Sequence, residues 1–242
     1  MAVRILITND DGINAPGIRH LVEWARDKGE VTVVAPKVEQ SAKSHAIEIR
    51  ADIEIKPLDI FDGVRAYSMD STPADCVRYA VLGLKEQFDI VFSGINRGPN
   101  LGRDVVYSAT VSAVFEAARL GIPAIAFSTD FESFDNAVAS LEDVYSFFKE
   151  NRLMEQNSLY NVNIPSTQTK DILITRQGGI YFTDEFIPTG EENMYRPVGH
   201  CVYEGTTNLE EDIDAFKCGY VSVTPMVYTR TNLELVKKLQ GK

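Results

Sequence analysis

Along the first 150 residues of this 242-residue chain, short apolar runs alternate with segments that repeat apolar side chains at helical spacing. Residues 3–8 are mostly apolar and rich in β-branched side chains, as in a buried parallel strand. Gly12, Pro16 and Gly17 then break the chain, and apolar positions with the period of a helix run from Ile18 to Ala25. The same pattern predicts strands at residues 31–35, 89–93 and 124–127, and helices from residue 72, at about 108–120 and at about 134–150.

Local signals support these boundaries. Thr72, Pro73 and Asp75 are typical of a helix start, with a hydroxyl cap followed by proline and an acid in the first turn. Gly121 and Pro123 are a typical helix stop. Two further β segments are predicted near residues 47–55 and 66–69. Because strands and helices alternate, we expect an α/β fold with a doubly wound, mainly parallel, Rossmann-like sheet.

The pattern changes after about residue 159. Strands are predicted at residues 159–164, 172–175 and 220–224, and a terminal helix at 231–239. Residues 178–206 are rich in glycine, tyrosine and polar side chains, which indicates an extended hairpin. The sequence has no repeat and no linker. We therefore expect a single domain over residues 1–242, with residues 178–205 forming a C-terminal β-rich arm.

Composition narrows the class of protein. With 44% hydrophobic and 24% charged residues, the chain is typical of a soluble globular protein. No apolar run approaches the roughly 20 residues that a membrane span needs. The first predicted strand begins at residue 3, so we expect no signal peptide. A net charge of −11 disfavours binding to nucleic-acid backbones, and three scattered cysteines favour a reducing cytoplasm.

Several familiar catalytic motifs are missing from the sequence. It contains no GxxxxGK[ST] phosphate loop, no HExxH, no GxSxG and no CxxC, and its three histidines are too few for a multi-histidine metal site. What remains is a set of loops with oxygen-bearing side chains at the ends of successive predicted strands. They contain Asn9, Asp10 and Asp11; Gln40, Ser41, Ser44 and His45; and Asn96 and Asn100.

Asp10 and Asp11 directly follow the first predicted strand, at the sheet edge where open α/β folds bind ligands. Two adjacent carboxylates raise one another's pKa unless a cation or hydrogen-bond donors compensate. A turn with helix-capping acids would also explain the pair. Together with the hydroxyl and amide oxygens of the other loops, the aspartates form a hard ligand set that suits Mg²⁺, Mn²⁺ or Ca²⁺.

Ser108 and Thr110 stand at the start of the helix predicted at residues 108–120. Backbone N–H groups and the helix dipole favour an anion such as phosphate at this position. Ser108 would also serve as an ordinary helix cap. The joint occurrence of these side chains at strand ends favours a metal-assisted phosphate site.

Five motifs occur in order along the chain, namely ILITNDDGINAPG, VVAPKVEQSAKSH, STPADCV, SGINRGPNLGRDVVYSAT and GYVSVTP. They resemble those of the SurE family of survival proteins, which are metal-dependent 5′-nucleotidases, and the similarity extends from residue 3 to about residue 225. The resemblance implies one divalent ion per subunit, Mg²⁺ or Mn²⁺, held by Asp10, Asp11, Ser41 and Asn96. It also implies that Ser108 and Thr110 lie on the phosphate side of that ion.

The candidate residues follow from the loops and the resemblance together. The candidate catalytic residues are Asp10, Asp11 and Asn96, and the candidate substrate-binding residues are Asn9, Ser41, His45, Gly94, Ser108 and Thr110. The family usually has glycine where this chain has Ala109. We expect the alanine to be harmless because it is a good helix former.

The resulting hypothesis is a phosphomonoesterase that hydrolyses nucleoside 5′-monophosphates by direct attack of a metal-activated water. The proton acceptor stays open between a paired aspartate, a metal-bound hydroxide and His45. A haloacid-dehalogenase-type phosphatase fits less well, because Asn9 stands where its nucleophilic aspartate would be. The alternatives are a nucleotide-binding protein without turnover and a phosphoacceptor signalling module, although Ser93 and Gly94 stand where the module needs an aspartate.

The apolar and aromatic side chains of residues 178–205 predict an oligomer. Exposed in a monomer, they would form a larger apolar patch than soluble monomers usually tolerate. A hairpin folded back on its own domain is the alternative. SurE-like proteins form dimers through exchanged C-terminal elements and often tetramers, so the resemblance implies a homodimer or homotetramer.

Overall fold

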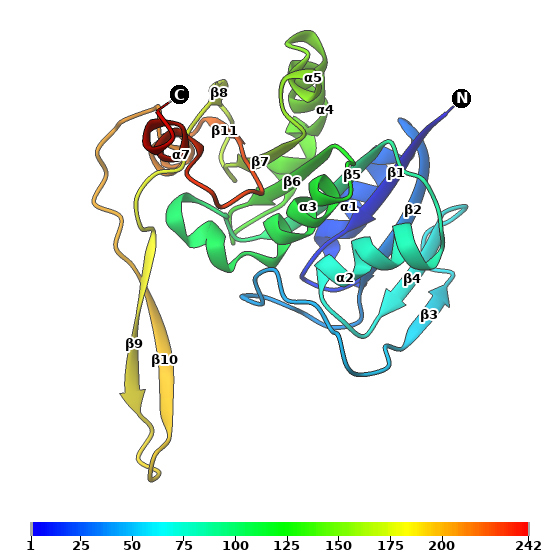
Figure 1. Cartoon of the computed structure of the whole chain (residues 1–242), viewed down its shortest axis with the longest axis horizontal. Coiled ribbons are helices and arrows are strands. Elements are labelled where there is room, and N and C mark those ends of the chain that lie inside the picture. The colour runs from blue at the N-terminus through cyan, green and yellow to red at the C-terminus, as the bar shows by residue number, and fades with distance from the viewer. Residues whose placement is uncertain (1, 242) are drawn as a thin grey trace.

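A computed structural model describes residues 2–241 and contains a nine-stranded sheet with helices on both faces (Figure 1). The strands of the sheet are β1 (Val3–Thr8), β2 (Gly29–Pro36), β3 (Ile55–Leu58), β4 (Arg65–Met69), β5 (Ile90–Arg97), β6 (Ala124–Thr129), β7 (Leu159–Ile164), β8 (Ile172–Ile174) and β11 (Val221–Pro225). Their spatial order is β3-β4-β2-β1-β5-β6-β7-β11-β8. Within the described residues, the antiparallel pairs of this sheet are β3 with β4 and β11 with β7. The predicted doubly wound, mainly parallel sheet is confirmed.

Alternate side chains of the central strand explain the two helical layers. Leu6 points to one face of the sheet, and Ile5 and Ile7 point to the other, and all three are buried. Helices α1 (Pro16–Ala25) and α4 (Asp135–Glu150) cover the face of Ile5 and Ile7. Helices α2 (Pro73–Arg78) and α3 (Ala109–Arg119) cover the face of Leu6. A strand buried on both faces needs a continuous apolar run, which is the pattern of residues 5–7 at the buried part of β1.

The chain reverses its direction of travel through the sheet at β1. It moves from β1 to β2 on one side and later enters β5 on the other, so β1 pairs in parallel with both strands. The connections that leave β1 and β5 therefore diverge at the carboxyl ends of these two strands. Open α/β sheets bind their ligands in the crevice that this divergence creates.

The β segment predicted near residues 47–55 is wrong. Residues 46–54 form no strand, and the edge strand β3 begins at Ile55. The carboxylate of Glu48 accepts hydrogen bonds from the backbone N–H groups of Ile49, Arg50 and Ala51 at 2.9, 2.7 and 3.0 Å. Such side-chain bonds to the backbone compete with strand pairing and bend the chain into a turn. Ile49 is 74% exposed, so this apolar side chain does not pack into the core as a strand residue would.

Several short helices complete the chain. Helix α2 continues as a π-helical turn, η1 (Tyr79–Gly83), and a 3₁₀ turn, η2 (Gly102–Tyr107), lies between β5 and α3. The sequence pattern predicted the terminal helix α7 (Leu233–Leu239) but missed α5 (Leu153–Gln156) and α6 (Asp212–Lys217). None of the helices found in residues 2–241 is long and apolar enough to cross a membrane.

Strands β9 (Phe182–Pro188) and β10 (Tyr195–Cys201) form a separate antiparallel hairpin that projects away from the main sheet (Figure 1). The predicted C-terminal β-rich arm therefore has the extended hairpin form that its sequence indicates. Asp104 fastens the base of the hairpin, because its Oδ2 accepts hydrogen bonds from the N–H groups of Tyr181 and Phe182 at 2.9 and 2.7 Å.

Candidate functional site

A cavity of about 420 Å³ lies at the carboxyl ends of β1 and β5. Its wall includes Asp10 after β1, Ser41 in the loop after β2, Asn96 near the end of β5 and Ser108 just before α3. Four candidates that come from separate stretches of the sequence therefore meet in one place. We call this space the Asp10 cavity.

Asp10 is the most deeply buried carboxylate of the Asp10 cavity, with 4% of its surface exposed. Its Oδ1 accepts a hydrogen bond from the hydroxyl of Thr110. Burial raises the pKa of Asp10 to about 7; the Thr110 hydrogen bond opposes this rise, and the charge of Asp11 adds to it. In the described chain, none of the side chains that shift this pKa is a cation. Ionised Asp10 therefore lacks a compensating positive charge from the protein.

Asp11 lies partly buried beside Asp10 and connects two loops, because its Oδ2 accepts a hydrogen bond from the N–H of Arg97 at 3.2 Å. Burial raises the pKa of Asp11, and the bond from Arg97 opposes the rise. Glu39 raises the pKa of both aspartates and accepts a hydrogen bond from the Ser41 hydroxyl at 2.7 Å. The negative charges of Asp11 and Glu39 therefore disfavour ionised Asp10, and a cation at this sheet edge would relieve that repulsion.

The start of α3 adds a position for an anion. The Ser108 hydroxyl accepts a hydrogen bond from the N–H of Val111 at 3.1 Å, so Ser108 is the N-cap of α3. The helix dipole and the free N–H groups of the first turn favour phosphate here, beside Asp10. Ala109 is the first helical residue and has no positive φ, so the backbone at this position does not require glycine.

Two candidate substrate contacts instead support the backbone. Asn9 is fully buried, and its Nδ2 donates to the carbonyl of Gly12 at 2.9 Å, which holds the turn after β1. Gly94 has a φ of +132°, and a Cβ there would lie 2.2 Å from the carbonyl oxygen of Phe127 on β6. Glycine at position 94 therefore permits the close approach of β5 to β6. Neither residue forms part of the wall of the Asp10 cavity.

The structure also separates His45 from the Asp10 cavity. His45 lines a second cavity of about 470 Å³, and its Nε2 lies 3.0 Å from Oε2 of Glu116. The backbone between Ser41 and His45 passes through left-handed conformations at Ala42 and Ser44, with φ of 57° and 52°. This path directs the two side chains to different cavities.

Asn100, one of the oxygen-bearing side chains expected at the strand ends, also lies in the wall of the Asp10 cavity, and its Nδ2 donates to the hydroxyl of Ser128 at 2.8 Å. Several other residues of the wall were missed as candidates. They are Arg97, Asp104, Tyr107, Phe131, Phe182 and Asp184. Phe182 and Asp184 belong to the hairpin, and no local signal places a hairpin side chain at a distant strand end.

The donor set of the Asp10 cavity fits a hard divalent cation. Asp10 supplies a carboxylate and Ser41 a hydroxyl, and the amide nitrogen of Asn96 donates to the Gly98 carbonyl at 2.8 Å, which leaves the amide oxygen available. Asp11 is not part of the cavity wall, but it is the next residue after Asp10 and its carboxylate adds a second negative charge beside the cavity. Across residues 2–241, no three His, Cys, Asp or Glu side chains are grouped as a metal site. A site here therefore depends on neutral oxygens as well, a set suited to Mg²⁺ or Mn²⁺ completed by water and substrate phosphate.

Comparisons with known proteins agree with this architecture. The family model described as "Survival protein SurE" matches residues 5–184. A 5′-nucleotidase SurE from Thermosipho melanesiensis is 39% identical over 252 residues, covering 99% of this chain and 97% of that protein. A 5′-nucleotidase SurE from Natranaerobius thermophilus is 39% identical and covers 99% and 98%. The crystal structure of the SurE protein from Aquifex aeolicus is 33% identical, with a TM-score of 0.77 and 98% of both chains covered. The chain belongs to the SurE family.

Proposed function

We propose that this protein hydrolyses nucleoside 5′-monophosphates to nucleoside and phosphate in the Asp10 cavity, with one Mg²⁺ or Mn²⁺ bound per subunit. Its assignment as a 5′-nucleotidase rests on near full-length relatives of that name. The observation that carries the proposal for the site is the meeting of Asp10, Ser41, Asn96 and Ser108 in one cavity at the carboxyl ends of β1 and β5. This position is the usual ligand site of an open α/β sheet.

The proposed division of labour follows from the chemistry of each group. Asp10 and Asp11 would hold the ion, together with the Ser41 hydroxyl and the Asn96 amide oxygen. When bound, the ion supplies Lewis-acid polarisation of a phosphoryl oxygen and lowers the pKa of a water molecule. The hydrogen bond from Thr110 keeps the Asp10 carboxylate in a fixed orientation.

The first turn of α3 would position the transferred phosphoryl group. Its free N–H groups point out of the helix end that Ser108 caps, and they carry partial positive charge. Phosphoryl transfer needs little covalent chemistry from the protein, so positioning and charge stabilisation supply most of the rate. Water would attack phosphorus in line while the nucleoside oxygen leaves.

Phosphate release from purified protein tests the proposal. The substrate panel contains nucleoside 5′-monophosphates, nucleoside 3′-monophosphates and sugar phosphates, each with Mn²⁺, Mg²⁺ or excess EDTA. We expect metal-dependent release from the nucleoside 5′-monophosphates and weaker release from the other esters. Turnover of sugar phosphates with nucleotides untouched would contradict the proposed substrate. Nucleotide binding without phosphate release under any condition would instead support the alternative of a binding or signalling module.

We also propose that the hairpin of β9 and β10 joins copies of this chain into a homodimer or homotetramer. Phe186, Ile187, Met194 and Tyr195 are 71%, 44%, 53% and 59% exposed in the single chain. A second copy would remove these apolar side chains from water. Closed two-fold symmetry is the commonest arrangement for such self-contacts.

A further inference from the structure

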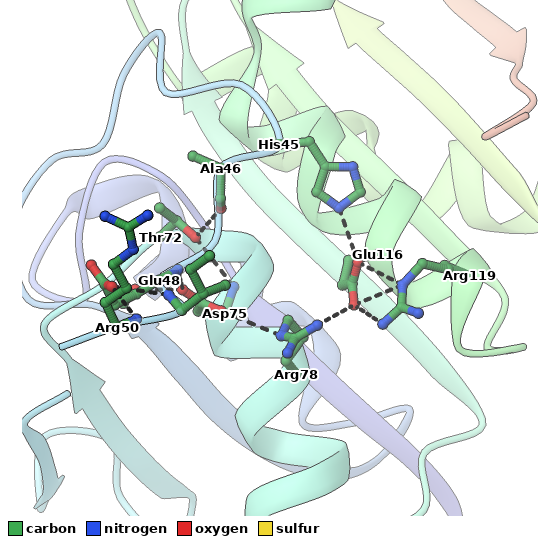
Figure 2. Close-up of polar contacts among 11 residues, drawn as sticks. His45, Ala46, Glu48, Arg50, Thr72, Asp75, Arg78, Glu116 and Arg119 are labelled. Carbon is green, nitrogen blue, oxygen red and sulfur yellow. Dashed lines mark hydrogen bonds and ion pairs between the residues drawn. The ribbon is translucent and has the colours of Figure 1, made fainter. Parts of the chain in front are cut away.

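Glu116 of α3 is a buried carboxylate that the proposed chemistry does not use. Its side chain is 3% exposed and lies among three basic groups. Nε2 of His45 is 3.0 Å from Oε2, the Arg119 guanidinium is 2.7 Å from Oε1, and the Arg78 guanidinium is 3.7 Å from Oε1. Figure 2 shows the His45 ring and both guanidinium groups pointing toward this single carboxylate.

Glu116 is held in its ionised form. Burial alone would raise the pKa of Glu116, but hydrogen bonds from His45 and Arg119 and the charge of Arg119 outweigh it and hold the pKa at about 2. An ionised carboxylate only accepts hydrogen bonds, so the imidazole must donate from Nε2. The contact between His45 and Glu116 is therefore a directed, charge-assisted hydrogen bond.

The segment that carries His45 has no regular structure to hold it. Residues 37–54 contain neither helix nor strand. Ala42 and Ser44 adopt left-handed backbone conformations, which are unfavourable for residues other than glycine. Such a path persists only where its surroundings fix it. Ser44 supplies two attachments, from its N–H to the Tyr107 carbonyl at 3.1 Å and from its hydroxyl to the Val106 carbonyl at 2.7 Å.

The next residues are fastened to α2. The Thr72 hydroxyl donates to the carbonyl of Ala46 at 2.7 Å, and the N–H of Glu48 donates to Oδ2 of Asp75 at 2.7 Å. Asp75 in turn lies 3.4 Å from the guanidinium of Arg78 (Figure 2). Between these attachments and Ser44, the bond from His45 to Glu116 is a hydrogen-bonded link from this segment to α3. The His45 ring also stacks on Phe115 of the same helix, with 6.5 Å between ring centroids.

We infer that Glu116 is a positioning residue: through His45 it holds the turn of residues 41–45 in the path that brings Ser41 to the Asp10 cavity. This inference rests on the proposed function, in which Ser41 is a ligand of the divalent ion. Ser108 caps the N-terminus of α3 and Glu116 lies near its C-terminal end. The same helix therefore provides the anion position through its first turn and holds the turn of residues 41–45 through Glu116. One rigid element thus aligns the two sides of the site.

A purely structural role for Glu116 makes a different prediction. If the carboxylate only neutralises Arg119 and Arg78 and fastens α2 to α3, loss of Arg119 should matter as much as loss of His45. Arg119→Ala is therefore the matched control, because it removes a 2.7 Å contact to Glu116 without touching the 41–45 turn. His45→Gln is the conservative variant, because its amide N–H reaches about as far as the imidazole Nε2.

The experiment combines hydrogen exchange in metal-free protein with Mn²⁺ binding by calorimetry and steady-state kinetics. For His45→Ala we expect amide exchange across residues 41–46 to speed up about tenfold, the Mn²⁺ dissociation constant to rise about tenfold, and KM to rise more than kcat falls. We expect Arg119→Ala to stay within about twofold of wild type, and His45→Gln to recover most of the loss.

Three results would overturn the inference. They are unchanged exchange across residues 41–46 in His45→Ala, faster exchange with unchanged Mn²⁺ affinity, and equal effects of His45→Ala and Arg119→Ala. Failure of the proposed function is a separate result, namely wild-type protein that neither binds Mn²⁺ nor releases phosphate. The exchange measurement in metal-free protein still reports on the turn in that case.

Discussion

Replacing Asp10 by asparagine should stabilise the metal-free protein while it removes activity. Asp10 is buried, and burial followed by the charge of Asp11 raises its pKa from 3.8 to about 7 despite the hydrogen bond from Thr110. At about 1.4 kcal/mol for each pKa unit, an ionised Asp10 destabilises the metal-free fold by about 4 kcal/mol. Asparagine has the same shape and carries no charge, and its amide oxygen can accept the bond from Thr110.

The pH dependence has a definite sign. Because folding raises this pKa, the carboxyl group is neutral in both states below about pH 4, and the destabilisation is absent there. The destabilisation grows as the pH rises from about 4 to 7 and is complete above 7. We expect Asp10→Asn to recover about half of it, roughly 2 kcal/mol at pH 8, since the buried amide must also be desolvated. For a chain of this size that is a rise in Tm of about 4–8 °C.

Thermal unfolding in EDTA at pH 5 and pH 8 measures the effect. At pH 5 the raised pKa of Asp10 costs only about 1.5 kcal/mol, which the desolvation of the amide offsets, so the stabilisation of Asp10→Asn should be absent there. Asp89→Asn is the control, because a hydrogen bond from Arg4 lowers the pKa of the exposed Asp89 to about 2, and its loss should not raise the Tm. An Asp10→Asn variant that unfolds at a lower temperature than wild type at pH 8 would show that the Asp10 charge does not destabilise the metal-free fold.

Three further predictions concern the site and the hairpin. Asp11→Asn should lower phosphate release by at least about a hundredfold with an unchanged circular dichroism spectrum, since the substitution removes a charge beside Asp10 but little volume; a variant with wild-type kcat would exclude Asp11 from the site. Ala109→Gly should keep its activity within about twofold and lose about 0.5–1 kcal/mol of unfolding free energy in a denaturant titration; a large gain in activity would show that alanine impairs this enzyme. Deletion of residues 180–203 with a short Gly/Ser bridge should reduce the mass in solution to that of a monomer, and an unchanged oligomeric mass would contradict a dimer made by the hairpin.

The parts of the fold that follow from the sequence are those that burial dictates. Residues 5–7 must all be apolar because both faces of β1 are covered there, so the strand is visible in the pattern. Near residues 47–55 the sequence pattern predicts a strand that does not form, because three hydrogen bonds to the Glu48 carboxylate turn the chain. A hydrogen bond between a side chain and nearby N–H groups leaves no periodic signal.

The residues of the candidate site also divide into those that have a local sequence signature and those that do not. Asp10, Asn96 and Ser108 could be predicted because strand ends and helix starts have local signatures, and the topology brings such ends together. The separation of His45 from Ser41 could not be predicted, because it depends on positive φ at Ala42 and Ser44, and neither residue type signals such a conformation. Phe182 enters the wall from the hairpin, through a long-range contact that no local pattern encodes.

The proposed function depends on a divalent ion held by Asp10 and Asp11, without which the Asp10 cavity would not hydrolyse nucleotides. To test this dependence, the protein is stripped with chelator, and phosphate release from a nucleoside 5′-monophosphate is then measured during a titration with Mn²⁺. We expect no turnover in the stripped protein, recovery that saturates near one bound Mn²⁺ per subunit, and no recovery in Asp11→Asn. Full turnover by wild-type protein in excess chelator would contradict this dependence.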